Sequence, residues 1–136
     1  MTIRLSPYLQ FNGKARRAME FYQTVFGGEL ALSTFADTGV EGPKGNEIMH
    51  GMLETDDGLV LMGADAAPGM GESDPVNDFS ISLSGSATDD ARLREYWSKL
   101  SETGTVTVPL EPQMWGDTFG MCVDSFGINW MVNIGK

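Results

Sequence analysis

The stretch SPYLQFNGKARRAMEFYQTVFGG, residues 6–28, decides the architecture of this chain. Its first part continues an alternation of apolar residues that begins at Ile3 and predicts a strand over residues 3–11. From Ala15 to Phe26 the apolar residues recur at helical spacing, which predicts an amphipathic helix. Gly27 and Gly28 end that helix, because glycine readily takes the backbone conformation that closes a helix. The stretch is therefore a strand followed by a helix.

Outward from this stretch, three more strands follow. Alternation predicts them over residues 29–35, 47–54 and 59–64, with a glycine-rich loop at 37–46. The last two strands flank Thr55-Asp56-Asp57-Gly58, which is a hairpin signal. Residues 1–65 thus form a first βαβββ module.

A segment rich in proline, glycine and acidic residues, 66–77, has no periodicity and is predicted to be a linker. The pattern then restarts, and residues 78–136 form a second module. Its helix is capped by Thr88 and ends at Gly104. A loop flanked by Pro109 and Pro112 follows its second strand. The strands of this module are predicted over residues 79–83, 105–110, 118–123 and 128–134.

The repeated order of elements indicates an internal duplication within one domain, residues 1–136. We therefore predict an α+β fold of two βαβββ modules. Each module has a curved mixed sheet with one helix packed on its convex face. The concave faces are left free to form a cup.

Composition excludes several classes of function. The net charge of −10 argues against nucleic acid and an anionic membrane surface as partners. No apolar run approaches the roughly 18–20 residues that span a bilayer, and the N-terminus lacks the apolar core of a signal peptide. We therefore expect a cytoplasmic protein. The lone cysteine, Cys122, lies in an apolar run and is predicted to be a buried small hydrophobe.

Four segments carry a family resemblance. Residues 6–28 resemble the opening module of the vicinal oxygen chelate superfamily, which includes glyoxalase I, bleomycin-resistance proteins and extradiol dioxygenases. Three further segments add to this: MHGMLETDDGLVLMGAD (49–65), WGDTFG (115–120) and DSFGINWMV (124–132). They narrow the resemblance to the bacterial PhnB-like branch, also called demethylubiquinone methyltransferase-like. No glycine-rich nucleotide loop supports the methyltransferase label.

The resemblance implies a homodimer with a ligand in the cup. In metal-using members, the first and fourth strands of each module supply four ligands to a divalent ion. Aligned on glyoxalase I, these positions fall at Pro7 or Tyr8, near Leu61, near Ser80, and at Met131. None suits a divalent ion in an oxygen-rich site, because thioether sulfur prefers soft metals and leucine has no ligating atom. We therefore expect no metal and no cofactor.

His50, the only histidine, lies on the third strand. It is a candidate general base or hydrogen-bond anchor in the cup, because histidine titrates near neutral pH. The alternative is a strand histidine bonded to neighbouring backbone. Glu54 shares its face but lies about 13 Å along the strand, too far to form a catalytic pair.

Trp115-Gly116-Asp117 precedes the seventh strand. Trp115 could stack on a ligand, Gly116 could allow close backbone approach, and Asp117 could accept a hydrogen bond. The alternative is that Trp115 seals the end of the sheet while Asp117 orders the turn.

On the last strand, Asn129, Met131 and Asn133 share the face opposite the apolar one. Amides flanking a flexible methionine suit a neutral or polar small molecule. The alternative is an ordinary exposed sheet face.

The sequence thus predicts a metal-independent protein that binds a small molecule of unknown identity. The second hypothesis is a lyase or dioxygenase-type enzyme that uses His50 as a base or a non-standard metal site. Whether the protein is an enzyme stays open at this point, because one fold serves many activities.

Overall fold

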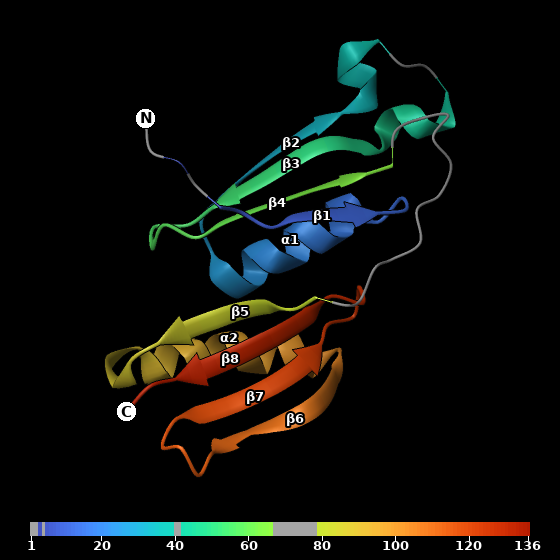
Figure 1. Cartoon of the computed structure of the whole chain (residues 1–136). Coiled ribbons are helices and arrows are strands. Elements are labelled where there is room, and N and C mark those ends of the chain that lie inside the picture. The colour runs from blue at the N-terminus through green and yellow to red at the C-terminus, as the bar shows by residue number, and fades with distance from the viewer. Residues whose placement is uncertain (1–2, 4, 40–41, 67–78) are drawn as a thin grey trace. The chain divides into compact units, whose positions relative to one another are not determined.

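The computed structural model describes residues 3, 5–39, 42–66 and 79–136. The chain divides into two compact units, Met1–Pro75 and Val76–Lys136, and each contains one helix and one four-stranded sheet (Figure 1). Nearly all of the predicted linker lies outside the described residues. None of the described helices is long and apolar enough to cross a membrane.

The first unit has the predicted βαβββ order. Its sheet has the strand order β1-β4-β3-β2, in which β1 pairs parallel with β4 and the other pairs are antiparallel. The predicted loop before β3 contains two short 3-10 turns, Phe35–Thr38 and Pro43–Asn46. The elements are β1 (Tyr8–Phe11), α1 (Ala15–Phe26), β2 (Glu29–Thr34), β3 (Ile48–Glu54) and β4 (Val60–Asp65).

The core of the first unit lies between α1 and one face of this sheet. The predicted apolar stripe of α1 is buried, with Met19 and Tyr22 fully covered. Leu9 and Leu53 are buried on the sheet. Gly63 leaves room for Met19, since a Cβ there would crowd its sulfur, and a Cβ on Gly51 would crowd the Leu32 side chain.

Asp65 joins three elements of the first unit. Its buried carboxylate accepts backbone N–H groups from Gly13 at 2.8 Å, Ala15 at 3.0 Å and Ile48 at 2.9 Å. The first two bonds lie at the start of α1, where a negative charge also complements the helix dipole. The end of β4 is thereby fixed to α1 and β3.

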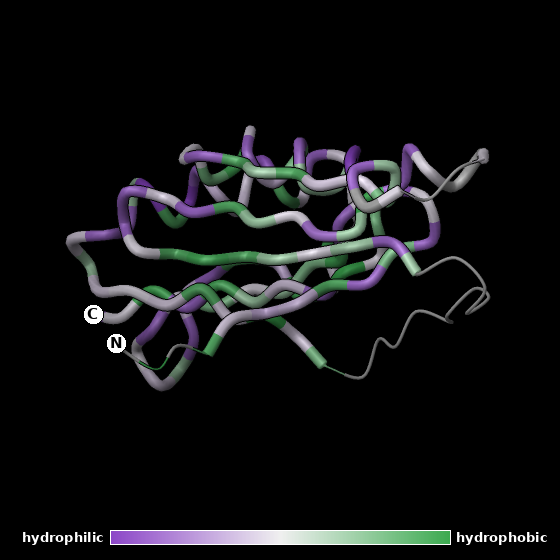
Figure 2. Tube along the Cα trace, turned by 90° about the horizontal axis from the view of Figure 1, so that it is seen from above, coloured by the Kyte–Doolittle hydropathy of each residue, from purple (hydrophilic) through white to green (hydrophobic). Residues whose placement is uncertain are grey.

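The second unit repeats this order and topology. Its sheet has the strand order β5-β8-β7-β6, again with a parallel pair between its first and last strands. The hydrophobic stretches lie within the strands and the turns between them are hydrophilic (Figure 2). The elements are β5 (Ile81–Gly85), α2 (Asp90–Glu102), β6 (Thr105–Pro112), β7 (Thr118–Val123) and β8 (Asn129–Ile134).

Trp130 and Leu100 anchor the core of the second unit, together with Val132; all three are almost fully buried. The indole N–H of Trp130 donates to the buried Asp124 carboxylate at 2.8 Å. The other oxygen of Asp124 accepts the backbone N–H groups of Phe126 and Ile128, which closes the β7–β8 turn.

Several predicted boundaries were wrong. The strand predicted over residues 79–83 lies two residues later, at Ile81–Gly85. The first strand begins at Tyr8, because Pro7 has no N–H to donate and only its carbonyl joins the sheet, accepting from Met62 at 3.0 Å. Ser86, instead of Thr88, is the cap: it closes the 3-10 turn Ala87–Asp89, which leads into α2, through a reciprocal pair with Asp89.

β6 continues through both prolines of the predicted loop and ends at Pro112. This is possible because β6 is an edge strand, where proline needs no partner for its missing N–H. The pairing with β7 shifts between Val108 and Glu111, around Pro109.

The predicted α+β class of paired βαβββ modules is confirmed. In each unit one sheet face packs against the unit's own helix. The opposite face, called here the helix-free face, carries the candidate functional residues.

Candidate functional site

His50 lies on the helix-free face of the first sheet. It sits on β3, directly opposite Ser33 on β2, and is partly buried. The Tyr8 hydroxyl lies 3.4 Å from its Nδ1, and the two ring centroids are 5.9 Å apart. β4 lies between β1 and β3, so the two side chains meet across it. The predicted alternative of a bond to neighbouring backbone is not what the structure has, since the partner is a side chain 42 residues away.

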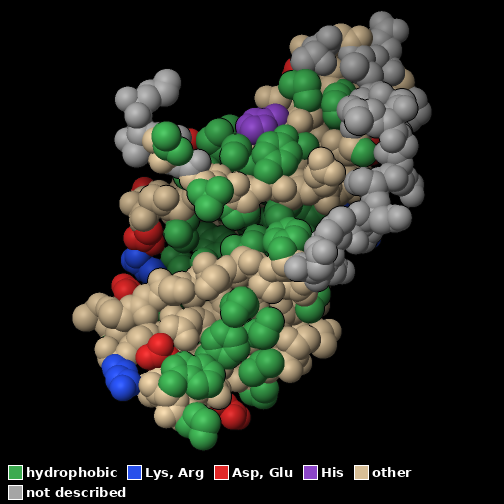
Figure 3. All heavy atoms as spheres, viewed as in Figure 1, with side chains coloured by type: hydrophobic (Ala, Val, Ile, Leu, Met, Phe, Trp, Pro, Cys, Tyr) green, Lys and Arg blue, Asp and Glu red, His purple; other side chains and the backbone are tan. Residues whose placement is uncertain are grey.

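Thioethers surround this pair. Met62 of β4 is in register with both Tyr8 and Met52. Figure 3 shows the histidine among hydrophobic side chains on the viewer's face of the first unit. A hydrogen-bonding pair in apolar surroundings is the composition of a small-molecule subsite.

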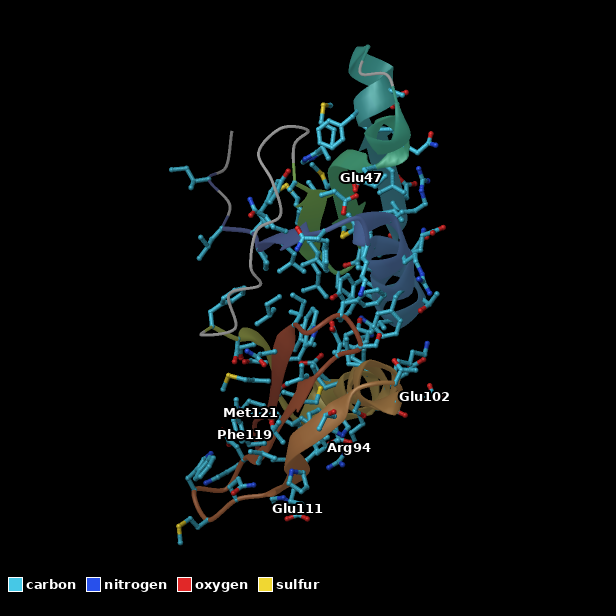
Figure 4. All side chains as sticks on the ribbon, turned by 90° about the vertical axis from the view of Figure 1, so that its right-hand side faces the viewer. Glu47, Arg94, Glu102, Glu111, Phe119 and Met121 are labelled. Atoms are coloured by element: carbon cyan, nitrogen blue, oxygen red, sulfur yellow. The ribbon has the colours of Figure 1, made fainter. Side chains whose placement is uncertain are left out.

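The other predicted residues lie on or beside the helix-free face of the second sheet. Met131 is in register with Ser82 on β5 and with Met121 on β7. Figure 4 shows Met121 and Phe119 on the side of the sheet away from α2. The amide–thioether–amide set of β8 thus shares its face with hydroxyl, thioether and aromatic side chains.

The structure brings Asp117 and Asn133 together. The Asn133 amide donates to the Asp117 carboxylate at 3.1 Å. The turn itself is closed by backbone bonds, with the N–H of Gln113 donating to the Asp117 carbonyl at 2.8 Å. The Asp117 side chain therefore ties the loop to β8, and its carboxylate retains further acceptor capacity.

Trp115 does not seal the sheet end, because 57% of it is exposed. Its ring meets the edge of Phe119, with centroids 6.2 Å apart and an angle of 60° between planes. Beside it, the space over Gly116 is filled by the Lys136 side chain. The indole therefore offers an exposed surface for stacking on the helix-free side.

Asn129 is engaged within the protein. Its amide donates to the Phe79 carbonyl at 3.0 Å, which ties β8 to the residue preceding β5 by two positions. Sequence reasoning did not identify Tyr8 as the partner of His50, nor Phe119, Ser82 and Ser84 as residues of the second face. The alternation of strand residues could have placed each of them on the helix-free face of its own sheet, because each is one residue from a buried neighbour.

Residues 4–132 match the family model of the glyoxalase/bleomycin resistance protein/dioxygenase superfamily. The chain belongs to this superfamily. A solved structure, protein PA1353 from Pseudomonas aeruginosa, is 34% identical, with a TM-score of 0.85 and 98% of each chain covered. Protein YjdN of Escherichia coli is 26% identical over 145 residues, covering 97% of this chain and 95% of that protein. A PhnB protein from Bacillus cereus shares the fold at 21% identity, with a TM-score of 0.73 and coverage of 98% and 100%.

The metal positions of the superfamily can now be placed by register. In the first unit, Tyr8 on the first strand and Met62 on the fourth are in register, and both lie on the helix-free face. Leu61 is instead buried in the core. In the second unit the corresponding pair is Ser82 and Met131, since Ser80 precedes β5. The sequence alignment was therefore off by one position in β4 and by two in β5.

Neither pair fits a hard divalent ion. The first offers a phenol and a thioether and the second a hydroxyl and a thioether, and thioethers are ligands for soft metals. Across residues 3, 5–39, 42–66 and 79–136, no three His, Cys, Asp or Glu side chains come together as metal ligands would.

Proposed function

We propose that this superfamily member is a metal-independent, PhnB-like small-molecule-binding protein whose ligand contacts a helix-free sheet face. One observation carries the proposal. On the three strands β5, β7 and β8, the helix-free face contains no charged side chain, and Glu111 of the edge strand β6, opposite Phe119, lies at its border. The residues of this face on the three strands are Ser82, Ser84, Phe119, Met121, Val123, Asn129, Met131 and Asn133.

This composition fits neither a solvated sheet face nor a core. A face that meets only water usually alternates in charged and polar residues, and a core is hydrocarbon. A mixture of hydroxyls, amides, thioethers and an aromatic ring is typical of a ligand surface, where a few polar groups orient a mostly apolar molecule. Methionine side chains adapt to ligands of different shape.

The proposal takes the protein as a homodimer, as the family resemblance implies. Its cytoplasmic location stays a prediction from the sequence.

The test is a small-molecule screen read by methionine methyl NMR. The chain has nine methionines, and substitution assigns each signal. We expect compounds that raise the melting temperature and shift the signals of Met121 and Met131. The signal of Met19, which is fully buried against α1, should stay in place and serves as the internal control.

A charge in the centre of the face should abolish this binding. We expect Met131→Glu to lose the hits, because a carboxylate there would have to be desolvated by the ligand. Ser98→Glu on the exposed side of α2 is the matched control and should bind as the wild type does. Hits that never move Met121 or Met131, or a library with no hits, would contradict the proposal.

The enzyme hypothesis has one supporting observation, the Tyr8–His50 contact, since a histidine oriented by a second group can act as a base. Mass spectrometry of every bound compound after incubation decides between the two. Conversion of a hit that His50→Ala abolishes would favour the enzyme. Binding without conversion supports the binding protein.

A further inference from the structure

In the Tyr8–His50 pair, the atom His50 Nε2 is available to bind a ligand. The inference from this atom rests on the proposed function and specifies one chemical group of the ligand. The phenol O–H can donate to His50 Nδ1 at 3.4 Å. A neutral imidazole whose Nδ1 accepts carries its proton on Nε2. In the described part of the chain, no side chain or backbone group pairs with Nε2. With the phenol as the donor, the ring presents one N–H donor, on Nε2.

Apart from the Ser33 hydroxyl on β2, directly opposite His50, the strand neighbours of this donor are mostly apolar. Met52 and Met62 flank the pair, and Ala31 of β2 lies opposite Met52. An N–H donor in such a place loses water when a ligand covers it, so a ligand without an acceptor would leave it unsatisfied. A ligand with an oxygen acceptor would not.

Charge on the same face selects the kind of acceptor. Glu29 and Glu54 stand directly opposite each other at its far end, about 13 Å along the strand from His50. No Lys or Arg lies on the helix-free side of the described strands in this unit. With a net charge of −10 as well, an anion would find no cation to pair with there.

We propose that Tyr8 and His50 form a subsite for a neutral carbonyl-type oxygen carried on an apolar or aromatic body. Tyr8 is the positioning residue, because it holds the imidazole in the tautomer that donates from Nε2. Met52 and Met62 contact the apolar body of the ligand. His50 makes the hydrogen bond.

The chain has a single histidine, so its NMR signals can be recognised without residue-by-residue assignment. Its ring Hε1 proton gives one NMR signal, which is followed during titration with three matched probes: acetophenone, benzoate and ethylbenzene. We expect acetophenone to shift that signal with saturation. Ethylbenzene, which lacks the acceptor, and benzoate, which is an anion, should bind at least threefold more weakly.

Two variants test the roles of the pair. His50→Leu removes the donor and should weaken acetophenone binding roughly three- to tenfold, the effect of one hydrogen bond. Tyr8→Phe should weaken it less and should change the ring-nitrogen chemical shifts of His50 in the free protein, since the tautomer is no longer fixed. A purely structural role of Tyr8 would leave those shifts unchanged. Gln10→Ala, on the same face of β1, should behave as the wild type does.

The possible failures are distinguishable. Acetophenone that binds His50→Leu as well as the wild type, or that never shifts the His50 signal, overturns the subsite. Benzoate that binds more tightly than acetophenone overturns the choice of a neutral ligand. If other compounds still shift Met121 and Met131, only this inference fails and the proposed function stands.

Discussion

The Cys122 thiol is a residue whose chemistry is set by burial. It is 1% exposed, and its burial, followed by the nearby Asp124 carboxylate, raises its pKa from 9.0 to about 11. The thiolate is the reactive form, so the native thiol is inert at neutral pH. The sequence prediction of a buried small hydrophobe is confirmed.

This raised pKa makes stability depend on pH in the alkaline range. The folded state holds the thiol proton up to about pH 11, while an unfolded thiol with a pKa of 9.0 ionises earlier. The contribution is therefore complete below pH 9 and is lost as pH rises toward 11. It amounts to on the order of 2 kcal/mol.

We expect urea unfolding to show this loss in the wild type and a smaller one in Cys122→Val. Comparing the two proteins at each pH removes the titration of lysines and tyrosines, which both share. Equal pH profiles for the two proteins would show that the thiol does not contribute.

Asp65 is a second residue whose local contacts contribute strongly to the free energy of unfolding. We expect Asp65→Asn to destabilise the protein by about 3 kcal/mol, because a neutral amide cannot accept all three backbone N–H groups and turns a donor toward one of them. Asp56→Asn, in the exposed β3–β4 turn, is the matched control and should change stability by less than about 0.5 kcal/mol. Chemical denaturation measures both, and similar values for the two would contradict the assigned role.

At the scale of elements, the end of α1 depends on two glycines with different neighbours. Gly27 and Gly28 both have positive φ, 74° and 88°. A Cβ on Gly27 meets nothing within 4 Å, whereas a Cβ on Gly28 would overlap the Glu54 carbonyl oxygen. Both substitutions by alanine strain the backbone, but only the second forces α1 away from β3.

We therefore expect Gly27→Ala to cost about 1–3 kcal/mol and Gly28→Ala about 2 kcal/mol more. Thermal unfolding followed by far-UV circular dichroism compares the two. Equal losses would mean that the close approach to Glu54 is not tight in solution.

The sequence predicted element order well and element position less well. Helical spacing placed α1 correctly, because its stripe of Ala15 to Phe26 is uninterrupted. Strand register was harder, since shifting by one residue moves every side chain to the other face. The second metal position of the superfamily thus fell near Leu61, a core residue, whereas the residue in register with Tyr8 is Met62.

The pairing of Tyr8 with His50 could not be predicted from the sequence alone. It depends on β4 lying between β1 and β3, which is a property of the topology. The course of β6 through Pro109 likewise depends on its being an edge strand.

At the scale of the whole molecule, two units with little sequence in common have the same topology. Both pair their first and last strands in parallel and cover one sheet face with the intervening helix. Each unit therefore places a residue of its first strand beside one of its fourth, on the helix-free face. In this chain those pairs are Tyr8 with Met62 and Ser82 with Met131.

These pairs predict how the protein responds to metals. We expect elemental analysis of the purified protein to find no stoichiometric metal. Excess Ni, Zn, Mn, Mg or Fe(II) should leave the melting temperature unchanged, because an ion that bound the native state would raise stability by RT ln(1 + [L]/Kd).

A double substitution at the first pair provides the positive control. Tyr8→His with Met62→Glu puts a nitrogen and a carboxylate donor in register on adjacent strands, and Zn or Ni should then raise the melting temperature. A metal that copurifies with the wild type and is lost in His50→Ala would contradict the metal-independent proposal. It would favour the enzyme hypothesis, because His50 would then be a ligand at a position outside the strand pairs that the superfamily uses.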